Sequence, residues 1–181
     1  LICVAACGTE TEGGEGVCTD SADRTGYPEG PYGVKEGDTL ANLSFKDSDG
    51  NDFALENLYQ DGAARLVLIS TGAGWCSACI EEQPQLEAWA AKYKDQGLRV
   101  LMTVFEDTNF AKADVAYANL WKTRYNLTIP VVADGDAQFS SYYDASLAPM
   151  NMIVEACTMK IVRIIVGADP SGIETIIEAK L

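Results

Sequence analysis

Histidine is absent from the 181 residues of this chain. Its absence excludes Ser-His and Cys-His catalytic pairs, and it excludes zinc or copper sites built on imidazole ligands. Basic residues are also scarce, because 13 Lys and Arg stand against 27 Asp and Glu and leave a net charge of −14. A surface this acidic disfavours nucleic acid and anionic lipid headgroups as direct partners. Acid–base chemistry therefore falls to Asp, Glu, Lys, Tyr or Cys.

Long apolar runs and phosphate-binding loops are missing as well. No segment approaches the roughly 20 apolar residues that a membrane-spanning helix needs. The run GGEG has no strand before it and no helix after it, so it does not predict a nucleotide site. The composition is nevertheless 48% apolar, which is enough for one domain with a hydrophobic core.

The first seven residues, LICVAAC, are apolar and end in small side chains. They resemble the end of a secretory signal followed by a bacterial lipobox, with Cys7 as the lipidated residue; a short buried strand is the alternative. Residues 8–33 are rich in Gly, Glu, Thr and Asp and predict a flexible acidic tether. We therefore expect an exported lipoprotein on the periplasmic side of a bacterial membrane, where disulfides persist. Gly8 after Cys7 points to the outer membrane in a Gram-negative host.

One domain is predicted over residues 34–181, with an α/β fold whose central mixed sheet carries helices on both faces. The predicted strands cover residues 43–46, 52–55, 65–70, 99–105, 128–132, 150–155 and 160–166. The predicted helices cover residues 76–93, 110–125 and 171–181. The first two strands form an N-terminal β-hairpin around DSDGN. Thr108 or Asn109 is expected to cap the second helix, and Asp169 or Ser171 the last.

Two cysteines, Cys76 and Cys79, stand two residues apart in the run GWCSAC. The predicted fold places Cys76 after a strand and a loop, at a helix start, where free N–H groups and the helix dipole stabilise a thiolate. Cysteines in such positions have pKa values lowered to roughly 3.5–7.5 from about 8.5. Cys76 is therefore predicted to be the nucleophile, and Cys79 the resolving cysteine of a redox-active disulfide.

The Cys76–Cys79 pair has two other interpretations. A structural zinc site needs four ligands, and the chain has neither a second CxxC nor a histidine to complete one. A purely structural disulfide is the second alternative, but it does not need the strand–loop–helix setting or the preceding Trp75. The setting therefore favours a reversible redox couple.

The motif WCSAC behind an apolar strand resembles the active site of the thioredoxin superfamily. Pro84 follows the motif by five residues, where thioredoxins carry a helix-kinking proline. Ala148-Pro149 precedes the strand MNMIVE at the position of the family's cis-proline loop. The opening GDTLANLSFKDSDGNDFALENL and the βα insertion between residues 107 and 136 are similar to the TlpA/ResA-like branch (redoxin, AhpC/TSA type). The similarity covers about residues 36–181.

This resemblance implies a thioredoxin-like fold and a thiol–disulfide oxidoreductase that serves cell redox homeostasis. Its partners would be protein thiols and disulfides together with a membrane or periplasmic electron donor, and it would use no metal and no cofactor. Cys76 would attack a partner's disulfide, and Cys79 would release the partner. Exported proteins are the expected substrates.

The resemblance also assigns roles to neighbouring residues. Trp75, Ala148 and Pro149 would line the groove that receives the partner's backbone. Glu82 matches a glutamate beside the active site of TlpA/ResA-like proteins. It is the candidate acid–base group for Cys79, with which it shares a helix face, and the alternative is a solvated member of a Glu-Glu pair.

The sequence departs from the family pattern at three places. Thioredoxin has a buried aspartate six residues before its first cysteine, where this chain has Ser70, and the departure adds weight to a glutamate as proton carrier. Ser77-Ala78 replaces the Gly-Pro of thioredoxin. Because this dipeptide tunes the reduction potential, the chain could act as a reductant or as an oxidant. Met150 replaces the usual threonine after the proline.

Two functions of other kinds remain open. A peroxiredoxin-like thiol peroxidase has a similar fold, but it needs a nearby arginine and a threonine three residues before its cysteine, where this chain has Ala73. A non-enzymatic Cu(I)-handling module would resemble assembly proteins of cytochrome oxidase, which carry CxxxC and a downstream histidine. Both features are missing here, although two thiolates could still bind Cu(I).

Cys18 in the tether and Cys157 in the turn between the last two strands are further candidates for pairing. In an oxidising compartment, a Cys18–Cys157 disulfide would attach the tether to the domain. The alternatives are two independent thiols, a bond between chains, or a resolving role for Cys157.

Overall fold

The computed structural model describes residues 24–181. The predicted lipobox with Cys7, and most of the predicted tether including Cys18, lie outside the described residues.

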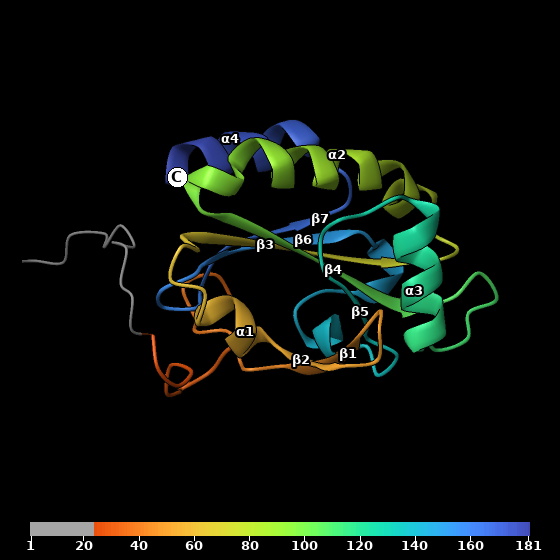
Figure 1. Ribbon diagram of the computed structural model, residues 1–181, viewed down its shortest axis with the longest axis horizontal. Coiled ribbons are helices and arrows are strands. Elements are labelled where there is room, and N and C mark those ends of the chain that lie inside the picture. The colour runs from red at the N-terminus through yellow and green to blue at the C-terminus, as the bar shows by residue number, and fades with distance from the viewer. Residues whose placement is uncertain (1–23) are drawn as a thin grey trace, which may run out of the picture.

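Within residues 24–181, seven strands form one mixed sheet in the order β2-β1-β5-β4-β3-β6-β7 (Figure 1). β3 pairs in parallel with β4 and β4 with β5, whereas the hairpins at the two ends of the sheet are antiparallel. The strands are β1 Ser44–Asp47, β2 Asp52–Ala54, β3 Leu66–Ala73, β4 Leu98–Glu106, β5 Val131–Ala133, β6 Met150–Glu155 and β7 Lys160–Val166. The predicted mixed sheet, with one hairpin at each end, is confirmed.

Helices cover both faces of this sheet (Figure 1). α2, α3 and α4 pack into the core on one face, and α1 with the 3-10 helix η2 packs into the core on the other. The α-helices are α1 Leu55–Tyr59, α2 Ser77–Tyr93, α3 Val115–Arg124 and α4 Pro170–Lys180. The 3-10 helices are η1 Lys94–Gln96, η2 Gln138–Ser141 and η3 Ala145–Leu147.

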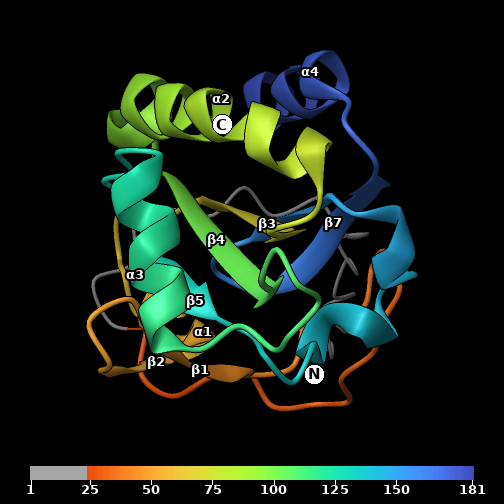
Figure 2. The ribbon, with the colours of Figure 1, turned by 90° about the vertical axis from the view of Figure 1, so that its right-hand side faces the viewer.

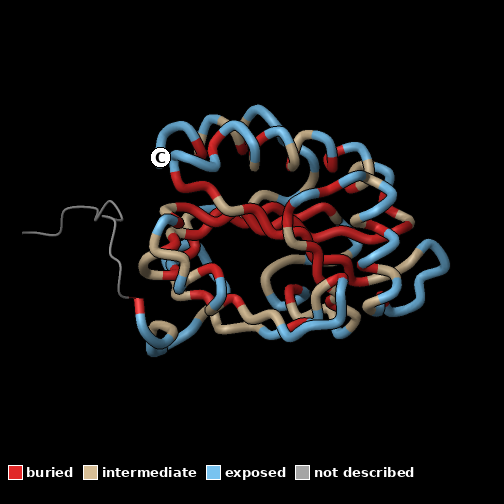
Figure 3. Tube along the Cα trace, in the orientation of Figure 1, coloured by how far each residue is buried: buried red, intermediate tan, exposed pale blue. Residues whose placement is uncertain are grey.

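The middle of the sheet is closed to solvent because β3 and β4 are apolar on both faces. All eight residues of β3 are buried, and the buried part of the chain runs along the central strands in Figure 3. A strand covered on both faces reads as a continuous apolar run rather than an alternating one. This rigid pair of strands positions the start of α2, which follows β3 directly in the chain.

α2 begins and ends close to where the sequence predicts. It runs from Ser77 to Tyr93 through Pro84, and Gly97 after η1 adopts φ 102°, which suits glycine. Asp169 caps α4 by accepting a hydrogen bond from the Gly172 N–H at 3.0 Å, as predicted.

Several element boundaries differ from the predictions, and the strand predicted at 65–70 continues to Ala73. The helix predicted from residue 110 begins at Val115 with Asp114 as its cap, because residues 107–111 form a tight turn around the Asp107 carboxylate. The strand predicted at 128–132 covers only Val131–Ala133. The second strand of the first hairpin ends at Ala54, where α1 begins. Each error lies at an end, where turn hydrogen bonds override the apolar pattern.

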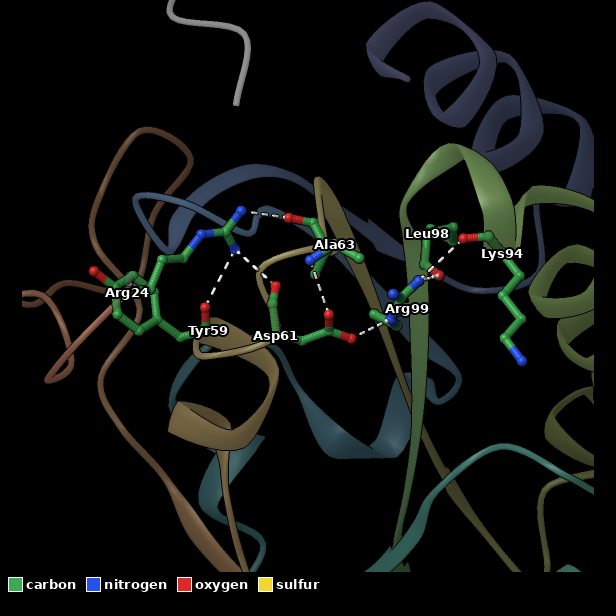
Figure 4. Close-up of polar contacts among 8 residues, drawn as sticks. Arg24, Tyr59, Asp61, Ala63, Lys94, Leu98 and Arg99 are labelled. Atoms are coloured by element: carbon green, nitrogen blue, oxygen red, sulfur yellow. Dashed lines mark hydrogen bonds and ion pairs between the residues drawn. The ribbon is translucent and has the colours of Figure 1, made fainter. Parts of the chain in front are cut away.

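The part of the predicted tether that the structure describes contacts the folded domain. Arg24 is only 7% exposed and donates hydrogen bonds to the carbonyl oxygens of Tyr59, Asp61 and Ala64. In Figure 4 this cluster continues through Asp61 to Arg99, whose Nε lies 2.5 Å from the carboxylate. Residues from 24 onward are therefore attached to the domain by a buried guanidinium group.

Over residues 24–181 no helix is both long enough and apolar enough to cross a membrane.

Candidate active site

The Cys76–Cys79 pair forms a disulfide at the start of α2. The two sulfur atoms are 2.05 Å apart and the two Cα atoms 5.3 Å apart. Cys76 is the N-cap of the helix, and its Sγ accepts a hydrogen bond from the Cys79 N–H at 3.1 Å. When the disulfide is reduced, this position favours a thiolate, because the first N–H groups of a helix have no carbonyl partner within it.

The segment before β6 brings a carbonyl oxygen to the reactive sulfur. The Ala148–Pro149 peptide bond is cis, as the resemblance implies. The Ala148 carbonyl oxygen lies 3.4 Å from Cys76 Sγ, and Pro149 is buried. Of the predicted groove residues, Ala148 therefore lies beside Cys76 although it is 72 residues away in the chain, whereas Trp75 directly precedes Cys76.

Trp75 is held beside the disulfide by a charged partner. Its indole Nε1 donates to the Glu106 carboxylate at 2.7 Å, and its ring meets the edge of Phe105 at a centroid distance of 6.1 Å. The ring also stacks on Phe110, with centroids 5.5 Å apart and planes 19° apart. The orientation of this tryptophan is thus fixed from three sides by the end of β4 and its loop.

Glu82 is buried one turn after Cys79 on α2 rather than solvated. Only 4% of it is exposed, and its carboxylate accepts hydrogen bonds from Ser70 Oγ at 3.2 Å and Asn151 Nδ2 at 2.8 Å. Burial raises the pKa of Glu82, and the two hydrogen bonds oppose that rise because they stabilise the charged form. The alternative of a solvated glutamate is excluded, and a buried carboxylate with a raised pKa is suited to proton transfer.

The second cysteine of the pair, Cys79, is enclosed by packed side chains. Cys79 is 1% exposed, compared with 5% for Cys76. A Cβ added at Gly72 on β3 would come within 2.9 Å of Cys79 Cβ, so only glycine lets the helix approach the strand this closely. Gln83 donates to the Cys79 carbonyl at 2.6 Å and accepts from Trp121 Nε1 at 3.0 Å, which links α2 to α3.

The remaining predicted site residues lie as follows. Ser77 is exposed and Ala78 half-buried in the first turn of α2. Cys157 lies in the turn between β6 and β7, at the other end of β6 from Pro149. Because Cys18 and Cys7 lie outside the described residues, the predicted bridge and the predicted lipidation stay predictions.

Sequence reasoning missed several contacts of the site. Asn151 lies two residues after the cis-proline and faces Ser70 across the β3–β6 pair. A polar residue inside the apolar run MNMIVE was a usable signal for this contact, because buried amides need partners. Glu106 and Phe110 had no such signal, since their contacts with Trp75 depend on how the loop after β4 turns.

Over residues 24–181 no three His, Cys, Asp or Glu side chains are grouped so that they could hold a metal ion.

A CxxC disulfide at a helix start, opposite a cis-proline and on a mixed α/β sheet, defines a thioredoxin-like protein. The Redoxin family model matches residues 35–180, so the chain belongs to the Redoxin family.

Individual relatives agree with this assignment. Thioredoxin-like protein YneN of Bacillus subtilis is 29% identical over 60% of this chain and 59% of its own length. Thiol-disulfide oxidoreductase ResA of Bacillus cereus is 24% identical over 72% of this chain and 69% of its own length. The chain thus spans about two thirds of these curated relatives. A Chlorobium tepidum protein assigned as thiol:disulfide interchange protein DsbE shares the fold, with a TM-score of 0.68 and 19% identity over 82% of this chain and 99% of that one.

Proposed function

We propose that this chain is a thiol–disulfide oxidoreductase that exchanges disulfides with protein partners through Cys76 and Cys79. The observation that carries the proposal is the Cys76–Cys79 disulfide at the N-terminus of α2, with the Ala148 carbonyl 3.4 Å from Cys76 Sγ. The Redoxin family model and the relatives named thiol–disulfide oxidoreductases support it. A peroxidase is not favoured, because Ala73 stands where that chemistry needs threonine.

The exchange runs in two steps. In the reduced protein, the Cys76 thiolate attacks one sulfur of a partner disulfide, the partner's S–S bond breaks, and the leaving thiolate takes up a proton. Cys79 then loses its proton and attacks Cys76 Sγ, which breaks the mixed disulfide, closes the Cys76–Cys79 bond and releases the second partner thiol. Two electrons pass from the cysteine pair to the partner, and the reverse sequence oxidises a partner dithiol.

Glu82 is the group that accepts the proton of Cys79 and returns it. Glu82 lies one turn after Cys79 on α2 and is buried, and Ser70 and Asn151 fix its carboxylate. Histidine is absent from the chain, and burial raises the pKa of Glu82 above its usual value, which makes this carboxyl a better proton acceptor.

We also propose that the protein works outside the cytoplasm as a lipoprotein, with exported proteins as partners and a membrane or periplasmic electron donor. The support is the lipobox-like run ending at Cys7 and the acidic stretch that follows. Mass spectrometry of membrane-extracted protein should find a diacylglyceryl group on Cys7. Unmodified Cys7 in such protein, or membrane attachment that survives Cys7→Ser, would exclude the anchor.

The redox function is tested by the equilibrium reduction potential of the pair in the whole chain, read from alkylation of the peptide that carries Cys76 and Cys79. A value near about −270 mV indicates a reductant, and a value near about −120 mV indicates an oxidant of exported proteins. Cys79→Ser should accumulate a mixed disulfide with a peptide disulfide through Cys76, and Cys76→Ser should not. Absence of a reversible two-electron couple would overturn the proposal.

A further inference from the structure

Large apolar side chains are exposed on two segments near the Cys76–Cys79 disulfide. Among the described residues, the most exposed are Phe110, at 67%, and Leu147, at 57%. Figure 2 shows the loop after β4 and the segment before β6 at the end of the sheet nearest the viewer, where α2 begins. We call Trp75, Phe110 and Leu147 the apolar rim.

Phe110 is placed in solvent by a loop with a defined structure. The Asp107 carboxylate accepts hydrogen bonds from the N–H groups of Asn109 at 2.7 Å and Ala111 at 2.9 Å, and the Asp107 N–H donates back to the Ala111 carbonyl at 2.8 Å. At the tip, Phe110 adopts φ 62°, a left-handed conformation that residues with a side chain rarely adopt. The strained aromatic residue is therefore held outward by its own loop.

The position of Phe110 relative to the nucleophile is also defined. Its ring stacks on Trp75, which directly precedes Cys76, and the Glu106 carboxylate fixes the indole at 2.7 Å. The stack places the exposed ring of Phe110 against the residue that precedes Cys76. A partner whose cysteine reaches Cys76 would bring the neighbouring side chain onto this surface.

Leu147 lies in the segment whose backbone reaches Cys76. It ends the 3-10 helix η3 and is followed by Ala148, whose carbonyl oxygen lies 3.4 Å from Cys76 Sγ. The Asp144 carboxylate caps η3 by accepting the Ser146 N–H at 3.0 Å, so Leu147 is also presented by a structured turn. Two separate segments near Cys76 therefore each expose a large apolar side chain.

Each of these two segments carries a carboxylate three residues before its exposed apolar residue. Asp107 lies in the turn that presents Phe110, and exposed Asp144 lies in the turn that presents Leu147. Hydrogen bonds from Ser146 lower the pKa of Asp144, so it is charged at neutral pH. The local charge has the same sign as the net charge of −14. A segment with a basic residue complements this surface.

We propose that the apolar rim is a docking surface for a protein segment that carries a large apolar side chain next to its reactive cysteine and a basic residue close by. The inference rests on the proposed exchange function and adds the substrate class to it. Phe110 would then be a specificity-determining residue, because burying the partner's apolar side chain against it favours the mixed disulfide with Cys76.

The test compares the reduced protein on three disulfides: glutathione disulfide, and two peptide disulfides with either Leu-Cys-Lys or Ser-Cys-Lys around the cysteine. Phe110→Asn suits the left-handed backbone and removes the aromatic surface. It should lower kcat/KM for the Leu peptide about tenfold and leave the other two substrates unchanged. Val34→Asn removes an exposed apolar side chain from the segment that pairs with the start of β7, and it should change none of the three.

A separate experiment tests the attraction between the basic residue of the partner and the carboxylates beside the apolar rim. Replacing Lys by Glu in the Leu peptide should lower kcat/KM, and added salt should reduce the difference between the two peptides. Equal rates for the Leu and Ser peptides, equal losses of all three substrates in Phe110→Asn, or a salt-independent difference would overturn the docking surface. If the wild type fails even on glutathione disulfide, the exchange function itself is wrong.

Discussion

Glu82 shows how two strands and a helix create one chemical group with unusual properties. Ser70 on β3 and Asn151 on β6 face each other across the sheet, and both donate to the carboxylate from α2. The oxygen of the Asn151 amide is buried with no hydrogen-bond partner. A protonated Glu82 could donate to such an oxygen after rotation of the amide, so the cluster can accommodate both protonation states.

Glu82→Gln should slow the steps in which Cys79 gains or loses its proton. General acid–base groups contribute about 10²–10⁴-fold, so we expect a loss of at least about 10²-fold in the rate at which Cys79 resolves a mixed disulfide. The measurement is stopped-flow resolution of a preformed Cys76 mixed disulfide across pH 5–9. Glu81→Gln, a substitution at the exposed neighbour on the same helix, is the matched control and should keep the wild-type profile.

Asn151→Ala extends this experiment. Loss of the 2.8 Å hydrogen bond removes a group that stabilises the charged carboxylate, so the pKa of Glu82 should rise further and the acidic limb of the profile should move to higher pH. A profile identical to that of the wild type in both Glu82→Gln and Asn151→Ala would show that Glu82 is structural.

The close contact between α2 and β3 depends on the lack of a side chain at Gly72. At Gly72 the strand passes the start of the helix so closely that an added Cβ would lie 2.9 Å from both Cys79 Cβ and Met102 Cε. Met102 belongs to β4, so the same position also sets how closely the neighbouring strand approaches. Two elements and the disulfide therefore depend on the missing side chain.

Gly72→Ala should destabilise the protein by about 1–3 kcal/mol, the usual cost of overpacking a close-packed core. The Cys79 Cβ is part of a helix end and cannot rotate away, although the end of Met102 can. The measurement is the free energy of unfolding of the oxidised protein in urea. A change below about 0.5 kcal/mol would mean that α2 shifts without resistance, contrary to this account of the site.

The loop that presents Phe110 shows the limits of prediction at the level of elements. The apolar pattern predicted helix from residue 110, but the Asp107 carboxylate takes two backbone N–H groups and Asp114 takes the cap of α3. Each carboxylate accepts backbone N–H groups of its own neighbours, Asn109 and Ala111 for Asp107 and Tyr117 for Asp114, and the pattern of apolar residues does not record these local hydrogen bonds. Central β3 and the start of α2 were predictable because a long apolar run and a strand–loop–helix order leave few alternatives.

A buried carboxyl makes the stability of the whole molecule sensitive to pH. Asp134, which follows β5, is 2% exposed and accepts the Gln138 N–H at 2.9 Å. Burial raises its pKa to about 6. Because the folded state holds this proton more tightly than the unfolded state, the contribution is most favourable at low pH and is lost as pH rises from about 4 to about 6.

Asp134→Asn should therefore remove a fall in stability of up to about 3 kcal/mol between pH 4 and pH 6.5, and it should be more stable than wild type at pH 7. Urea unfolding at several pH values measures this. Asp136→Asn is the control two residues away, where an ion pair with Lys112 lowers the pKa and the stability change has the opposite sign. Parallel pH curves for wild type and Asp134→Asn would contradict the account.

A second prediction at this scale concerns how the start of the chain is attached. Arg24 already joins the segment before the domain to three carbonyl oxygens. The predicted Cys18–Cys157 disulfide would add a covalent attachment six residues earlier. Peptide mapping without reductant should find a peptide bridged between Cys18 and Cys157. Its absence from protein that retains the Cys76–Cys79 bridge would exclude this attachment.

The sequence by itself determined the chemistry and the general architecture. The absence of histidine, the CxxC behind an apolar strand and the proline before MNMIVE are local features, and each restricts the backbone or the reaction directly. They were sufficient for the mixed sheet, the Cys76–Cys79 disulfide at a helix start and the cis-proline beside it. Asn151, Glu106 and Phe110 were decided only by the tertiary structure, because their partners are 69, 31 and 35 residues away in the chain. Contacts over such distances follow from strand register and loop conformation, which depend on the packing of the whole domain.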